Sequence, residues 1–255
     1  MSKLPEGFLE VDTDEMRMMR TKRKIMTESR LMDQQLDQVS GRKDRWAMIT
    51  TTYRPDEEWE PKQITRLVKA ARHYVEKHGF VFRYIWVLEM TKRGRPHYHL
   101  AIKLPHGLKL PKPDQAGWWQ HGMTRIEYVK YIVAYLAKYL SKVDSFEHYP
   151  KYARLTGSGG LPSEAKRESR LWMSPSYVRE EFGESANPFR AEGGGWVNRE
   201  TGEVMPSRYG LVWRSGRTVR LIDLWAGGKP PVTRSTAHGG HEPLHCQSIR
   251  PAVLQ

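Results

Sequence analysis

The sequence predicts an α+β fold in which one antiparallel sheet carries helices on one face. Segments rich in β-branched and aromatic residues alternate with segments of helical periodicity, in the order strand, helix, strand, strand, helix, strand. The second and third strands are separated only by a short glycine-containing turn, which indicates an antiparallel hairpin. The chain has 255 residues, of which 38% are hydrophobic, and this suffices for a packed core with extensions at both ends.

The first predicted element is a charged helical arm within residues 1–44. Residues 13–39 carry an interrupted apolar stripe, and Asp12 or Thr13 is suited to cap the helix. We expect a peripheral, solvated helix. Its basic residues would also suit phosphate contacts.

The central segment, residues 45–160, supplies the predicted sheet. Its elements are, in order, a strand at 46–53, a helix at 61–79, strands at 80–90 and 97–104, a helix at 124–142 and a strand at 152–156. This order is the split βαβ arrangement of ferredoxin-like, RRM-like folds.

Beyond the sheet, residues 161–225 form a predicted C-terminal extension. It contains a short helix candidate at 174–182 and a hairpin that turns at 198–202. Residues 226–255 are rich in glycine, proline and histidine, and we expect a flexible tail.

Charge and cysteine content narrow the classes of function. Lys and Arg number 42 against 29 Asp and Glu, a net charge of +13, which is typical of a protein that binds a polyanion such as nucleic acid. The single cysteine, Cys246, excludes a disulfide framework within the chain. No apolar run approaches the roughly 18 residues of a membrane span. We therefore expect a cytoplasmic location.

The strand at 97–104 separates its side chains onto two faces. Tyr98 and Leu100 belong to an apolar face, whereas His97 and His99 share the opposite face and lie close enough to converge on one metal ion. If the hairpin turn is centred on Gly94, Glu89 pairs opposite His99 and adds a carboxylate. A register different by one residue would send Glu89 to the core face.

Histidine pairs on half-exposed strands are also common without any metal. Two imidazoles and a carboxylate would suit a catalytic divalent ion, with Mg²⁺ or Mn²⁺ the physiological expectation, although imidazole also accepts Zn²⁺.

The helix predicted at 124–142 contains a stripe of four tyrosines. Packing is the more common role for such a stripe, and we assign it to Tyr128 and Tyr131. Tyr135 and Tyr139 lie one helical turn apart beside lysines, which favour the phenolate form, and are candidate nucleophiles.

Three segments in this order resemble the motifs of the HUH endonuclease superfamily, and most closely those of rolling-circle replication initiators of single-stranded DNA phages and plasmids. They are ITTTY at 49–53, RPHYHLAI at 95–102 and YLAKYLSK at 135–142. The resemblance covers about residues 45–160.

The resemblance implies a role for each of seven residues. Metal ligands would be His97, His99 and Glu89, the nucleophiles Tyr135 and Tyr139, and the basic residues beside them Lys138 and Lys142. The implied reaction is metal-dependent, site-specific nicking and joining of single-stranded or origin DNA through a 5′-phosphotyrosine intermediate, in the cytoplasm of a bacterial host cell. Since the sequence has no G-x-x-x-x-G-K-[ST] motif, a host helicase and a DNA polymerase are the expected partners.

Two other functions remain open. An HUH-type tyrosine transposase commonly uses one tyrosine, so the tyrosine pair favours replication. A non-catalytic DNA-binding replication accessory protein would keep the positive charge and the sheet, and its activity would be indifferent to EDTA.

Overall fold

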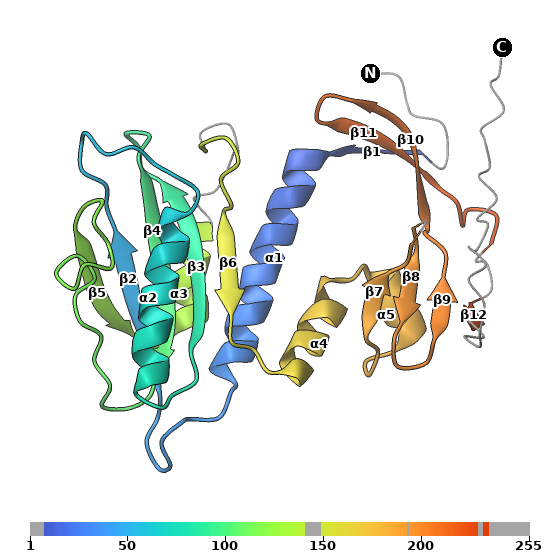
Figure 1. The fold of residues 1–255 in the computed structure, drawn as a ribbon. Coiled ribbons are helices and arrows are strands. Elements are labelled where there is room, and N and C mark those ends of the chain that lie inside the picture. The colour runs from blue at the N-terminus through green and yellow to red at the C-terminus, as the bar shows by residue number, and fades with distance from the viewer. Residues whose placement is uncertain (1–7, 141–148, 193, 229–231, 235–255) are drawn as a thin grey trace. The chain divides into compact units, whose positions relative to one another are not determined.

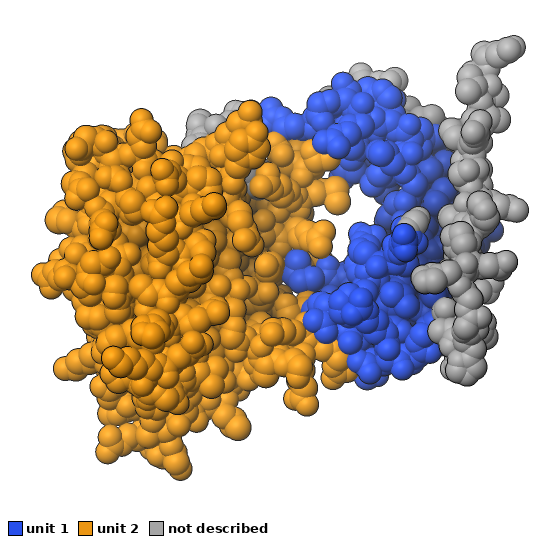
Figure 2. Space-filling model, in the orientation of Figure 1, with its two compact units in different colours: residues 1–11, 170–255 blue, residues 12–169 orange. Residues whose placement is uncertain are grey.

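The computed structural model describes residues 8–140, 149–192, 194–228 and 232–234 (Figure 1). The chain divides into two compact units, one of residues 12–169 and one of residues 1–11 with 170–255 (Figure 2). The α+β class and the antiparallel pairing predicted from the sequence are confirmed.

A five-stranded antiparallel sheet forms the centre of the unit of residues 12–169, with strand order β5-β2-β4-β3-β6. The strands are β2 (Arg45–Thr51), β3 (Arg83–Met90), β4 (Pro96–Leu104), β5 (Thr124–Val129) and β6 (Thr156–Gly159). The middle positions therefore belong to β2, β4 and β3, and every strand pair runs antiparallel.

Helices cover both faces of this sheet, so the prediction of helices on one face was wrong. The three helices are α1 (Thr13–Asp33), α2 (Gln63–Lys77) and α3 (Ile132–Leu140). Helix α2 packs on the face that carries Tyr98 and Leu100, whereas α1 and α3 share a second core with Met48 and Ala101. The reason is that β4 is buried on both faces, and each apolar face of a sheet needs a covering layer.

The N-terminal helix packs against the sheet instead of lying at the periphery. Asp12 caps it by accepting hydrogen bonds from two backbone N–H groups of the first turn. Ile25 and Met32 are buried in its later turns. At its C-terminal end the Lys103 ammonium donates to the carbonyls of Met32 and Gln35, where a cation stabilises the helix dipole.

The helix predicted at 124–142 is a strand followed by a shorter helix. Residues 124–129 form β5, which pairs antiparallel with β2 from Trp46↔Val129 to Thr51↔Thr124. Only Tyr135 and Tyr139 of the four tyrosines lie on α3. The helical spacing was misleading because the free edge of β2 offers β5 a full row of backbone hydrogen bonds. The last strand also begins later than predicted, at Thr156.

The second unit, residues 1–11 with 170–255, contains two small sheets. Its strands are β1 (Phe8–Asp12), β7 (Pro188–Arg190), β8 (Trp196–Asn198), β9 (Glu203–Met205), β10 (Tyr209–Ser215), β11 (Thr218–Asp223) and β12 (Thr233–Arg234). Helix α4 (Ser163–Met173) leads out of the first unit, and α5 (Ser176–Phe182) and the β8-β9 hairpin confirm the elements predicted there.

None of the helices in the described ranges combines the length and the apolar character that crossing a bilayer demands. The predicted nucleophile-flanking Lys142 lies outside the described residues, as does most of the predicted tail.

Candidate active site

The two faces predicted for the histidine strand are present in β4. Tyr98 and Leu100 enter the core under α2, while His99 and Ala101 face α1 and α3. His99 is almost fully buried, with 3% of its surface exposed, because α3 covers it. The histidine face is therefore an interior face of the unit and not an open sheet surface.

The register of the β3-β4 hairpin brings Glu89 to His99 along a diagonal. Glu89 pairs with His97, and Val87 pairs with His99, so the predicted pairing of Glu89 opposite His99 was wrong by two residues. The turn is centred on Arg93, with Gly94 at a φ of +72°. Since side chains alternate with a period of two, Glu89 keeps the predicted face. Its Oε2 lies 2.6 Å from Nε2 of His99.

Thr50 orients the His99 ring from the other side. It pairs with His99 across β2 and β4, and its Oγ1 lies 3.2 Å from Nδ1. When Nδ1 carries the proton and donates to Thr50, Nε2 presents a lone pair to the Glu89 carboxylate. Two such acceptors are held together only by a shared proton or a cation. A hydrogen bond at the second ring nitrogen is also what metal-bound histidines usually have.

The donor types fit a divalent cation, but only two of the three predicted ligands converge. His99 and Glu89 are in direct contact, and His97 lies on the same face, opposite Glu89 in the register. Within the described ranges, no three or more His, Cys, Asp or Glu side chains form a group that could hold a metal. The role of His97 as a ligand stays a prediction.

Helix α3 places both candidate nucleophiles beside this pair. The Tyr139 ring stacks on the His99 ring, with 3.6 Å between the ring centroids and 26° between the planes. Ile132 and Leu136, one turn apart, are fully buried against the sheet, as predicted for the aliphatic sector of this helix. Their packing sets the rotation of α3 and turns Tyr135 and Tyr139 toward the histidine strand.

A chain of hydrogen bonds links the two tyrosines to a carboxylate. The Tyr139 hydroxyl donates to the Tyr135 hydroxyl at 3.1 Å, and the Tyr135 hydroxyl donates to Glu127 at 3.1 Å. Glu127 also forms an ion pair with Arg125. Sequence reasoning missed Glu127 because it was assigned to a helix; alternation along a strand would have placed it on the face of Met48, its partner on β2.

Tyr135 is held in its protonated form in this structure. Burial raises the pKa of Tyr135 most, and the hydrogen bond from Tyr139 and the interaction with the Glu127 carboxylate raise that pKa further. The expectation that nearby lysines favour the phenolate therefore does not hold for Tyr135. Lys138 is exposed on α3.

Tyr128 and Tyr131, assigned to packing, are exposed instead. Tyr128 lies on β5 with 48% of its surface exposed, and the Arg45 guanidinium covers its ring at 4.1 Å. Tyr131 precedes α3 with 68% exposed. Both lie outside the helical stripe because the chain is not helical before Ile132.

The segment that holds this site resembles a class of proteins associated with replication. Residues 46–144 match a family model that describes replication-associated proteins of the ORF2 type. This range includes Thr50, Glu89, His99, Glu127 and Tyr139, although it is less than half of the chain. Comparisons with curated proteins and with solved structures found no match. The family match supports a role in replication.

Proposed function

We propose that the protein is a rolling-circle replication initiator of the HUH type, which nicks and rejoins single-stranded DNA at a specific site. The observation that carries the proposal is the stacking of Tyr139 on His99, whose other edge contacts Glu89. It puts a phenol beside a histidine-carboxylate pair in a chain with a net charge of +13. The match to a replication-associated family supports the same function.

In the proposed reaction the Tyr139 oxygen attacks the scissile phosphorus. A P–O bond to Tyr139 forms and the bond from phosphorus to the 3′ oxygen breaks, which leaves a 5′-phosphotyrosine and a 3′ oxygen that takes up a proton. The phenol proton moves to the Tyr135 oxygen while the Tyr135 proton moves to Glu127, along the two hydrogen bonds of 3.1 Å. A nucleophile activated by a hydrogen-bonded base in this way is general in covalent catalysis.

His99, Glu89 and His97 would hold the divalent cation, Mg²⁺ or Mn²⁺. When bound, such a cation neutralises charge on a phosphate oxygen. Thr50 holds the His99 ring in place through Nδ1, and the stacked Tyr139 ring fixes the plane of that imidazole.

Rejoining uses the second tyrosine. Tyr135 attacks a new strand end after Tyr139 has become esterified, since the two hydroxyls are already in hydrogen-bond contact. Lys138, one residue before Tyr139, and Lys142 would supply positive charge for the strand. A helicase to open the duplex and a polymerase to extend the free 3′ hydroxyl are the proposed partners.

Covalent capture tests this proposal. The full chain is incubated with Mn²⁺ and a pool of single-stranded 40-mers of random sequence, labelled at the 3′ end because the downstream fragment stays attached to the protein. We expect a labelled protein band, a peptide mass that maps the DNA to Tyr139, and loss of the band in EDTA.

The variants identify the nucleophiles. Tyr139→Phe should abolish most of the adduct, and the Tyr135→Phe, Tyr139→Phe double variant should abolish all of it. Tyr131→Phe is the matched control, because Tyr131 is an exposed tyrosine of the same segment. An adduct formed by the double variant contradicts the proposal, as does binding of the pool by the wild type without any adduct, which is the behaviour of a non-catalytic accessory protein.

A further inference from the structure

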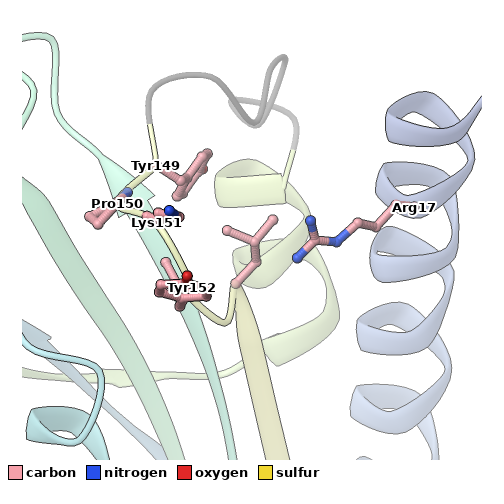
Figure 3. Close-up of a pocket in the computed structure, with 7 residues that line it drawn as sticks. Arg17, Tyr149, Pro150, Lys151 and Tyr152 are labelled. Atoms are coloured by element: carbon pink, nitrogen blue, oxygen red, sulfur yellow. The ribbon is translucent and has the colours of Figure 1, made fainter. Parts of the chain in front are cut away.

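A pocket of about 340 Å³ lies between α1 and the segment of residues 149–155. Figure 3 shows Arg17 projecting from α1 toward Tyr149, Lys151 and Tyr152. The residues that line it are Arg17, Tyr149, Pro150, Lys151, Tyr152, Ala153 and Leu155. This set combines two cations with two aromatic rings and has no carboxylate. The volume is at the small end of the range for ligand sites, which is about 300 to 1,000 Å³.

The pocket adjoins the strand that carries Glu89. The Tyr149 hydroxyl donates to the carbonyl of Leu88 at 3.5 Å, and the Leu88 N–H donates to the carbonyl of Leu155 at 2.8 Å. Leu88 immediately precedes Glu89 on β3. A strand of DNA bound at the candidate active site would therefore have a neighbouring nucleotide within reach of the pocket.

Tyr152 presents its ring to solvent from a strained backbone. It is 80% exposed and is the only non-glycine residue with a positive φ, +66°, in the described part of the chain. Strain of this kind tends to persist at functional sites, where the surroundings enforce it. The Lys151 ammonium lies 5.2 Å from the centroid of the same ring. A flat aromatic face with a cation at its edge is suited to stack on a base while the cation contacts the phosphate.

We propose that this pocket binds one unpaired base of the single-stranded DNA, next to the scissile phosphate, with the base stacked on Tyr152 and its phosphate held by Lys151 and Arg17. This inference rests on the proposed function, because it names a contact of the same substrate. It adds a binding site to the site of chemistry and assigns a role to α1, the helix on which Arg17 lies.

The test measures binding without chemistry. The full-length Tyr135→Phe, Tyr139→Phe variant is titrated in EDTA against fluorescent dT20, with anisotropy as the readout. Adding Tyr152→Ala should raise Kd about 5- to 150-fold, the equivalent of 1 to 3 kcal/mol per stacked base at 1.4 kcal/mol per factor of ten. Tyr152→Phe should restore affinity, since it keeps the ring. Lys151→Gln should reduce the slope of log K against log salt by about 0.7.

Tyr128→Ala serves as the matched control, because it removes an exposed tyrosine from β5, the opposite edge strand of the sheet. If stacking is the contact, an abasic 20-mer should bind equally well to the protein with and without the Tyr152→Ala substitution. Unchanged dT20 affinity in Tyr152→Ala, or an equal loss with the abasic strand, overturns the proposal. Displacement of dT20 by micromolar dTMP overturns it as well, since the pocket would then take a free nucleotide.

The two proposals fail separately. A wild-type protein that forms the covalent adduct while its dT20 binding ignores Tyr152→Ala refutes the pocket alone. A protein that shows the expected binding pattern in EDTA but never forms an adduct refutes the chemistry alone.

Discussion

The position of α3 should depend on one leucine. Leu136 is fully buried between α3 and the sheet, and α3 has only nine residues, too few to be stable without tertiary packing. Replacing a buried leucine by alanine costs about 2 to 5 kcal/mol, from lost transfer free energy and from the cavity that remains. For a unit of this size the cost corresponds to a fall in Tm of roughly 4 to 20 °C.

Leu36→Ala provides the matched control, because Leu36 is 89% exposed in the same unit and its truncation should change stability by less than about 0.5 kcal/mol. Urea denaturation of both variants, followed by circular dichroism, gives the comparison. Leu136→Ala should also lower adduct formation about 100-fold, since a shift of about 1 Å in Tyr139 against His99 is enough for that loss. Equal stability of the two variants, together with full adduct yield in Leu136→Ala, would refute the assignment of α3 as the element that positions the tyrosines.

Three further outcomes are expected. Asp12→Ala should destabilise the protein by about 0.5 to 2 kcal/mol in urea denaturation, because Asp12 caps α1, and Asp12→Asn should recover most of that loss. Gly157→Ala should cost about 1 to 3 kcal/mol, because a Cβ there would lie 2.4 Å from Nε1 of Trp86, and a double-mutant cycle should show a smaller cost in a Trp86→Leu background. The hydrogen bond from His121 lowers the pKa of Glu57 below its ordinary value of 4.5, so its contribution to stability is present above that pH and lost as the pH falls through the lowered value; a Tm series from pH 6 to 2.5 should be flatter in Glu57→Gln, and identical slopes would contradict the assignment.

Much of the candidate site was predictable from local patterns. Alternation along β4 separated His99 from Tyr98, and the short hairpin with its glycine placed Glu89 on the histidine face. The spacing of Tyr135 and Tyr139 put both hydroxyls on one side of a helix. These features follow from a period of two in strands and 3.6 in helices, which neighbouring residues express without reference to the rest of the chain.

The failures share another cause. The β3-β4 register was wrong by two residues because both alignments keep the same faces, and turn geometry alone selects between them. Residues 124–129 have a composition that either a helix or a strand accepts, and pairing with β2 decided for the strand. That pairing also carried Glu127 to Tyr135, a contact that no sequence spacing indicates.

The amino-acid sequence by itself determined the α+β class, the faces of the histidine strand, the tyrosine pair and the positive charge, because each is written in composition or in short-range periodicity. Only the tertiary structure decided that helices cover both faces of the sheet, that Tyr139 stacks on His99, and that Arg17 meets Tyr152 across a pocket. Those arrangements depend on which distant segments bury each other's apolar surfaces, and that choice is made by the whole fold at once.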